Sequence, residues 1–202
     1  MNRRKVVTFL AALACGTAAS QAHAGTKLVS SFREPSAGPL KFKKVLVLVI
    51  APHESQMQFG EAVLTNLMKR THGISAHAVM TGADARDEQK MRAYMEKEAF
   101  DGAVTMRLLA AGQETTSQWG VNASSYTGFW SYYSYAWPLV TDIGYVHTER
   151  LFHMETQVYS VKDDKLVWGA ITKTTNPKDA RQLVEQVAKT VGDALRKQQL
   201  VE

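Results

Sequence analysis

A continuous apolar run, Val-Leu-Val-Leu-Val-Ile at 45–50, is the strongest pattern in the chain. Such a run is typical of a strand in a parallel sheet that helices cover on both faces. Apolar residues then recur at every fourth position over 56–70, which predicts a helix. A strand at 74–80, a helix at 85–98 and a strand at 103–109 complete a strand–helix–strand–helix–strand unit.

After a long interruption, a second group of elements occupies the last part of the chain. The pattern predicts a long strand at 144–161, a hairpin turn at 162–165 and a returning strand at 166–174. Asn176-Pro177 is a strong start for a last helix, with Asn as its cap and Pro at its first position. One apolar stripe is predicted to face the core from that helix: Ala180, Leu183, Val184, Val187, Val191, Ala194 and Leu195.

Together these elements predict an α/β fold, with a mixed five-stranded sheet and helices on its faces. Right-handed crossovers favour the order second, first, third for the parallel strands. A single domain is expected over 41–202, since this length suits one hydrophobic core. The preceding segment, 25–40, is largely polar, contains two prolines and shows no periodicity. We expect it to be a flexible tether or an extended arm.

The start of the chain has the three parts of a secretory signal. Residues 3–5 are basic, residues 6–14 form an apolar core, and Ala-His-Ala at 22–24 fits the cleavage pattern. The apolar core is shorter than the roughly 20 residues that an ordinary transmembrane helix needs. Residues 1–24 are therefore predicted to be a signal peptide, with Gly25 as the first mature residue, and the mature protein is expected in the periplasm.

Cys15, the chain's one cysteine, opens a second interpretation of the same segment. Ala-Leu-Ala-Cys at 12–15 resembles a bacterial lipobox, in which the cysteine becomes the lipid-bearing first residue. Ala12 stands where leucine is usual, and the site at 22–24 competes, so a soluble product is favoured over one anchored in the outer membrane. A single cysteine excludes an intrachain disulfide in either case.

The basic balance of the chain comes largely from the signal. The chain has 24 Lys and Arg against 19 Asp and Glu, and its net charge is +5. Removal of residues 1–24 takes away three basic residues and no acidic ones, so the mature charge is 21 − 19 = +2. This charge gives no footprint for nucleic acid, which requires a clustered basic face.

The segment 110–144 is the most unusual part of the sequence. It holds eight of the chain's 18 aromatic residues within 19 positions, spaced mostly by Ser, Gly, Asn, Ala and Thr. These aromatic residues are the candidate binding residues: Trp119, Tyr126, Phe129, Trp130, Tyr132, Tyr133, Tyr135 and Trp137. Such a composition is unlike an ordinary linker, and a loop of this length in a compact domain is usually functional.

Two interpretations of this aromatic segment are open. Tyr and Trp give large contact areas at low entropic cost, so the rings can form a recognition surface for a glycan, a membrane interface or a partner protein. Alternatively, the segment is a flap folded over the sheet, and its rings complete the core. Both hold if one side of the flap packs inward and the other faces outward.

Polar residues on one predicted strand are weak candidates for a metal site. His147, Glu149, His153 and Glu155 share one parity of the strand at 144–161. The two histidines are roughly 20 Å apart in an extended strand, so one ion cannot bridge them. A solvated polar face is the better explanation, and no metal or other cofactor is expected.

His53 follows the first strand, at an edge where open α/β sheets often bind ligands, and is a weak candidate acid or base. Ser55 as the cap of the following helix explains this stretch more simply. Phosphate-loop, dinucleotide-binding, nucleophile-elbow and zinc-protease motifs are absent from the sequence.

Three short motifs give the chain a family resemblance: 42–48, 100–104, and Asp-Lys-Leu-Val-Trp-Gly at 164–169. With the helix after 42–48, they resemble a broad class of uncharacterised bacterial envelope proteins, many of them lipoproteins, in which a Lys-Leu-Val-Trp-like strand closes a hairpin before a last helix. The arrangement is more distantly similar to the amino-terminal domain of the Tol-system periplasmic protein and to the curli-secretion lipoprotein. The resemblance implies an envelope location and a binding or assembly role, and it supplies no catalytic residue.

These observations favour a non-enzymatic accessory protein of the cell envelope that binds a partner protein or a cell-wall glycan through the aromatic segment. The alternative is a small periplasmic enzyme or metal-binding protein that uses the strand-end histidines. Membrane association is expected only through a lipid on Cys15, and the oligomeric state is left open.

Overall fold

The computed structural model describes residues 25–68, 72–112, 127–140 and 151–201. Its helices and strands are β1 Gly25–Arg33, β2 Val45–Ile50, α1 Glu54–Leu67, β3 Gly73–Ser75, α2 Glu88–Lys97, β4 Gly102–Ala111, α3 Phe129–Ala136, β5 Leu151–Ser160, β6 Lys165–Thr175 and α4 Ala180–Lys197. Three short 3₁₀ turns lie at Ala76–Ala78, Asp84–Arg86 and Trp137–Leu139. Within the described ranges, no helix is both long and apolar enough to cross a membrane.

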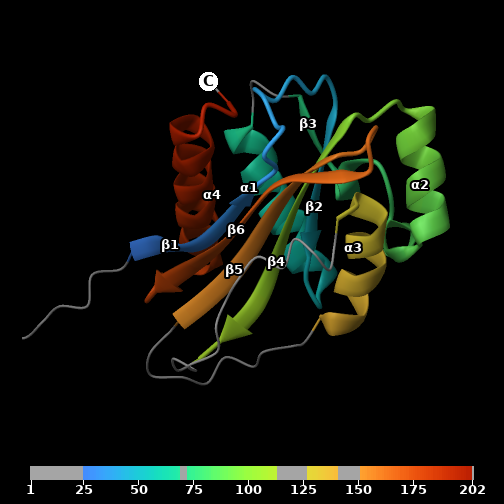
Figure 1. Ribbon diagram of the computed structural model, residues 1–202. Helices are drawn as coiled ribbons and strands as arrows, with labels where there is room; N and C mark the ends of the chain where they lie inside the picture. The colour runs from blue at the N-terminus through green and yellow to red at the C-terminus, as the bar shows by residue number, and fades with distance from the viewer. Residues whose placement is uncertain (1–24, 69–71, 113–126, 141–150, 202) are drawn as a thin grey trace, which may run out of the picture.

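One mixed six-stranded sheet forms the centre of the molecule, in the order β1-β6-β5-β4-β2-β3. The strands β3, β2 and β4 are parallel, and the pairs β4–β5, β5–β6 and β6–β1 are antiparallel. Helices α1 and α4 cover one face, and α2 and α3 cover the other (Figure 1). The predicted α/β class and the second-first-third order of the parallel strands are confirmed.

The strand β2 shows why an unbroken apolar run is required at this position. Leu46, Leu48 and Ile50 face the helices α2 and α3, whereas Val47 and Val49 face α1 and α4. Each of the six residues of β2 is buried. Both faces of the central strand therefore lie in a hydrophobic core, as expected for a sheet covered on both sides.

Of the two structures expected for 25–40, residues 25–33 have the extended one rather than the flexible tether, and they add a sixth strand to the sheet. Residues 25–33 form β1, which pairs with β6 along the edge of the sheet. After it, the backbone N–H of Glu34 donates to Val167 and that of Leu40 donates to Leu200, at 2.9 and 2.8 Å. Backbone pairing stabilises β1, whose Leu28 and Val29 stay exposed, so the strand has no clear apolar alternation to reveal it.

Several predicted boundaries also shift. The last helix begins at Ala180 and is capped by Asp179, whose side chain accepts a hydrogen bond from the Gln182 backbone N–H. Asn176, the predicted cap, has a positive φ of 48° and lies in the connection before the helix. The short strand β3 ends at Ser75, where the chain turns into a 3₁₀ segment. The hairpin turn occurs as predicted. In the predicted stripe of α4, Ala180 is exposed and Ala194 is half-buried, whereas the other five residues are buried: Leu183, Val184, Val187, Val191 and Leu195.

Candidate functional site

The described part of the aromatic segment forms the helix α3, which is fixed at its start by the β5–β6 hairpin turn. The Trp130 backbone N–H donates to the Asp164 carboxylate at 3.3 Å, and the Leu166 N–H donates to the Thr127 carbonyl at 2.6 Å. A Cβ on Gly128 would lie 2.6 Å from Asp164 Oδ2. Glycine at this position therefore lets the helix approach the turn closely.

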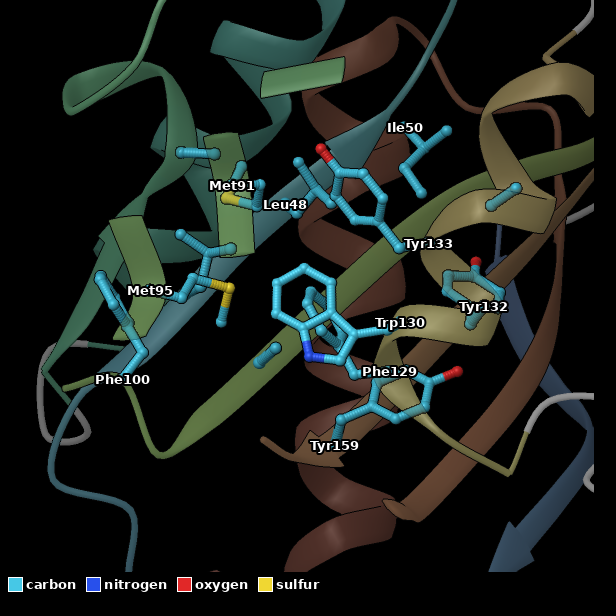
Figure 2. Packing of buried hydrophobic residues seen from close by; sticks show 14 of the residues in the cluster. Leu48, Ile50, Met91, Met95, Phe100, Phe129, Trp130, Tyr132, Tyr133 and Tyr159 are labelled. Carbon is cyan, nitrogen blue, oxygen red and sulfur yellow. The ribbon is translucent and has the colours of Figure 1, made fainter. Parts of the chain in front are cut away.

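The inner side of α3 is an aromatic cluster that completes the core (Figure 2). Phe129, Tyr132 and Tyr133 are at most 1% exposed, and Trp130 is 9% exposed. The Phe129 ring packs edge-on against Trp130 and against Tyr159 of β5, with centroid separations of 4.7 and 5.5 Å. For these four residues of α3, the second of the two interpretations is confirmed: the segment folds over the sheet and its rings complete the core.

The outer side of the same helix carries exposed apolar groups. Tyr135 is 38% exposed and Leu139, in the turn after the helix, is 45% exposed. Trp137 is half-buried, and the Arg86 guanidinium lies 5.2 Å from its ring centroid. Trp119 and Tyr126 lie outside the described residues. The described part of the aromatic segment thus has a buried set of four rings on α3 and an exposed pair, Tyr135 and Leu139.

A buried polar network lies beneath α3. Arg107 of β4 is paired directly with Glu155 of β5 in the sheet register, and its Nη2 lies 2.9 Å from Glu155 Oε2. The Tyr132 hydroxyl donates to the same oxygen at 2.9 Å, and the Gln157 amide donates to the other oxygen at 3.0 Å. Tyr159 in turn donates to the Gln157 carbonyl oxygen. The network joins α3 to two strands.

This network corrects the prediction of a solvated polar face on the strand before the hairpin. Glu155 and His153 are 5% and 7% exposed, since α3 covers Glu155 and the two faces of β5 are both buried. The Glu155 carboxylate neutralises Arg107 rather than remaining available to an ion. His147 and Glu149 lie outside the described residues. Within the described ranges, no group of three or more His, Cys, Asp or Glu side chains could hold a metal ion.

Burial also raises the pKa of three tyrosine hydroxyls near this network. Removal from water is the largest cause for Tyr132, Tyr133 and Tyr159, and the negative charge of Glu155 raises the pKa of Tyr132 and Tyr159 further. These hydroxyls therefore stay protonated and act as hydrogen-bond donors. They are structural donors to Glu155, Gln157 and the Ala85 carbonyl.

His53 lies at the carboxyl end of β2, as predicted, and is exposed. It occupies the N-cap position of α1, and its carbonyl accepts hydrogen bonds from the backbone N–H groups of Gln56 and Met57. The prediction that Ser55 caps this helix is wrong, because the helix already begins at Glu54. No side chain caps α1 through a hydrogen bond at the N-cap residue.

Comparison with known proteins gives a likeness of fold alone. No protein-family model matches the chain, and no curated protein matches its sequence. Among solved structures, the dodecamer of a Leu-to-Met variant of PelC from Paraburkholderia phytofirmans is 11% identical with a TM-score of 0.46, over 84% of this chain and 96% of that chain. Lipoprotein GNA1162 from Neisseria meningitidis is 12% identical with a TM-score of 0.38, over 76% of this chain and 98% of that chain.

These two likenesses concern general arrangement, and no residue role is transferred from either protein. Lipoprotein GNA1162 is similar to this chain in that general arrangement alone. The more distant resemblance to the Tol-system and curli-secretion proteins stays a prediction.

Proposed function

We propose that the protein is a non-enzymatic accessory protein of the bacterial cell envelope, which binds a partner protein or a cell-wall glycan through the exposed side of its aromatic segment. The division of α3 carries this proposal. Four buried rings fix the helix on the sheet, while Tyr135 and Leu139 remain on its outer side, 38% and 45% exposed. A rigid support with exposed aromatic and aliphatic groups is the arrangement expected of a recognition surface.

The position of Tyr135 supports binding rather than simple surface exposure. Its ring lies 5.5 Å from the Arg107 guanidinium, which is itself held by Glu155. A ring held by a fixed cation loses little conformational freedom when a ligand contacts it, because its orientation is already restricted.

The alternative of a small enzyme or metal-binding protein has less support at this place. Of the four strand residues proposed for a metal, the two that are described are buried, and Glu155 is engaged by Arg107 and Tyr132. Release of that carboxylate for an ion would leave Arg107 buried without its charge partner, at a cost of about 3 kcal/mol or more.

The test uses surface variants rather than a deletion, since removal of 119–137 would also remove four core rings. The full mature chain is compared with a Tyr135→Ser, Leu139→Ser double variant. Leu67→Ser is the matched control, because Leu67 is 57% exposed at the end of α1, on the opposite face of the sheet. All three proteins are expected to fold equally well, since none of these side chains is buried.

Two assays separate the two ligand classes. Co-sedimentation with purified peptidoglycan tests the glycan. Photo-crosslinking in living cells tests a partner protein, with a benzoylphenylalanine at the exposed position of Ser131, one helical turn before Tyr135, in the unmodified, double-variant and Leu67→Ser chains alike. We expect at least one of the two to fall by about tenfold in the double variant and to stay unchanged in Leu67→Ser. Equal binding by the double variant and the unmodified chain in both assays would overturn the proposal.

A further inference from the structure

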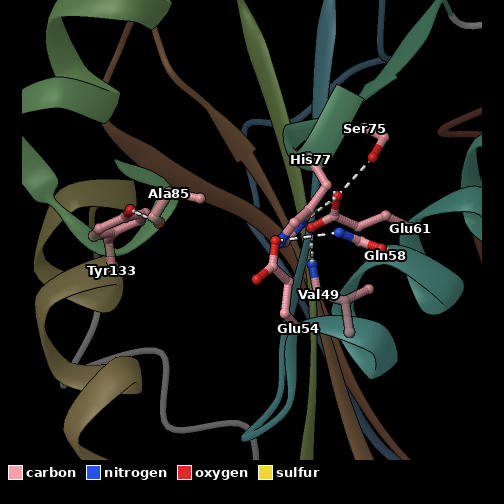
Figure 3. A network of polar contacts seen from close by, with 8 residues as sticks. All are labelled: Val49, Glu54, Gln58, Glu61, Ser75, His77, Ala85 and Tyr133. Atoms are coloured by element: carbon pink, nitrogen blue, oxygen red, sulfur yellow. Dashed lines mark hydrogen bonds and ion pairs between the residues drawn. The ribbon is translucent and has the colours of Figure 1, made fainter. Parts of the chain in front are cut away.

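A second feature of the molecule lies away from α3, around Glu61 on α1. This glutamate is fully buried, and its carboxylate accepts four hydrogen bonds (Figure 3). The Val49 backbone N–H donates to Oε1 at 3.1 Å. The Ser75 hydroxyl, the His77 backbone N–H and the His77 ring Nδ1 contact Oε2 at 2.6, 2.9 and 3.0 Å. The carboxylate is thus surrounded by hydrogen-bond donors.

This arrangement sets the tautomer of His77. Because both oxygens of Glu61 already accept hydrogen bonds from backbone N–H groups or a hydroxyl, we assign the proton of the remaining contact to His77 Nδ1. In the neutral ring, Nε2 then presents a lone pair as a hydrogen-bond acceptor. The side chain of His77 is only 4% exposed, yet its Nε2 is a buried atom with no hydrogen-bond partner. An orphaned buried acceptor in an ordered ring requires an explanation.

His77 also lines a pocket at the carboxyl ends of β2 and β3, an edge where open α/β sheets bind ligands. The pocket is open to solvent and has a volume of about 550 Å³. Its lining residues are Glu54, His77, Ala78, Val79, Met80, Thr81, Asp84 and Tyr94. Met80 and Tyr94 supply apolar surface to this wall, and the two carboxylates supply negative charge.

Glu54 carries the carboxylate that is better able to contact a ligand. Asp84 is already paired with Lys90 and accepts from the Thr81 hydroxyl. Glu54 accepts one hydrogen bond, from the Gln58 amide at 3.2 Å, and a carboxylate has room for several more. Gly82 positions it, since a Cβ there would lie 2.8 Å from the Glu54 carboxyl carbon and 3.0 Å from each of its oxygens.

We propose that this pocket binds a small organic cation, a primary amine whose ammonium group donates to His77 Nε2 and to the Glu54 carboxylate. An ammonium group has three donors, so it satisfies the orphaned nitrogen and pairs with the carboxylate in the same position. An anion would meet Glu54 and Asp84 as like charges, and it could not donate to a lone pair. The alkyl part of the amine packs against Met80 and Tyr94.

The pocket lies on a different surface from the one that contains Tyr135. This inference is therefore independent of the proposed function, and each can fail without the other. Two other outcomes are open to the same experiment. In the first, the pair of Glu61 and His77 only stabilises the packing of α1 on the turn after β3, and no probe binds. Alternatively, a protonated His77 can act as a donor to an anion. Each of these outcomes overturns the amine site.

The experiment follows the His77 ring nitrogens by long-range ¹H–¹⁵N correlation spectra of the full mature chain. Ethanolamine and 1,5-diaminopentane are the cationic probes, and acetate and inorganic phosphate are the anionic ones. We expect a saturable shift of Nε2 with the amines, and a spectrum of the unliganded ring with the proton on Nδ1. An absent shift, or a saturable shift with the anions instead, would refute the proposal.

Three variants make the result specific. Glu54→Gln removes the charge, and Gly82→Ala displaces the flexible Glu54 carboxylate. Each is expected to weaken amine binding by about tenfold or more. Glu185→Gln, an exposed carboxylate on α4, is the matched control and should leave binding unchanged. Equal binding in Glu54→Gln and in the control would show that the shift arises elsewhere.

Discussion

The Tyr132 hydroxyl on α3 donates a 2.9 Å hydrogen bond to the Glu155 carboxylate on β5, and both groups are buried. This bond links α3 to the buried ion pair of Arg107 and Glu155 in the sheet, in addition to the hydrophobic packing of the helix. The rigidity of the outer surface of α3 therefore depends on groups that the surface itself does not expose.

Glu155→Gln is expected to lower the free energy of unfolding by about 3 kcal/mol or more, because it leaves the Arg107 guanidinium buried without its partner charge. Tyr132→Phe removes only one hydrogen bond to a charged group and should cost about 2 kcal/mol. Urea unfolding followed by circular dichroism measures both variants. A smaller loss in Glu155→Gln than in Tyr132→Phe would contradict the arrangement described.

Phe129→Ala is expected to destabilise the fold by about 3–5 kcal/mol, since it leaves a cavity among Trp130, Tyr133 and Tyr159. Leu139→Ala is its control in the same segment. Leu139 is 45% exposed, so its truncation should change the stability by no more than about 0.5 kcal/mol. Thermal unfolding of the two variants side by side gives the comparison, and similar losses in both would argue against a buried helix.

Stability is expected to fall at alkaline pH. Burial raises the pKa of Tyr132, Tyr133 and Tyr159 above the ordinary value of about 10. Above about pH 10 the unfolded chain releases these protons while the folded chain keeps them, so the contribution to stability is complete below about pH 10 and declines above it. Urea midpoints measured from about pH 8 to about pH 11 test this sign.

A second readout keeps that prediction specific to tyrosine. The phenolate absorbance of the folded protein should lack the contribution of the three buried tyrosines at about pH 10, and it should appear together with unfolding. If all tyrosines instead ionise reversibly near this pH in the folded chain, the burial of these hydroxyls is wrong.

Glu61→Gln is expected to destabilise the fold by about 1–3 kcal/mol. An amide has one oxygen for the three donors at Oε2, and its nitrogen would then face the Val49 backbone N–H, donor against donor. Glu96→Gln on the surface of α2 is a control that should have little effect. Urea unfolding measures the loss, and the His77 nitrogen spectrum should show whether the proton leaves Nδ1.

Mass spectrometry of the mature amino terminus tests the predicted export. Cleavage after Ala24 gives an unmodified Gly25 and a chain without cysteine, and this is the expected product. An acylated Cys15 would instead establish the lipid-anchored form. Detection of the intact segment 1–24 in an envelope preparation would contradict both.

The elements that were predicted correctly are those whose hydrophobic pattern indicates which of their faces are buried. The unbroken apolar run of β2 indicates a strand that is buried on both faces, and the apolar stripe of α4 indicates a helix with one face packed on a core. In contrast, β1 is held by backbone pairing at an edge, and hydrogen bonds of the main chain leave no mark on side-chain pattern. A polar strand of this kind cannot be told from a tether by composition.

The candidate site was harder to predict because its contacts are long-range. The helical spacing of Phe129, Tyr133 and Trp137 is a signal that could have identified α3, although aromatic residues favour strands and obscured it. No local signal joins Glu61 to His77, since they lie on different elements and meet only through the parallel pairing of β2 and β3. Arg107 and Glu155 meet in the same way through β4 and β5.

The pairing of β1 with β6 has a consequence for the order in which the molecule is made. Gly25 lies opposite Thr175 and Arg33 lies opposite Trp168. The strand β1 therefore cannot pair until β6, about 140 residues later in the sequence, has been synthesised. In a chain exported amino terminus first, β1 emerges from the membrane long before β6. The closing of this edge is then a late, non-local step, and until it occurs the nascent protein presents an unpaired strand to its surroundings.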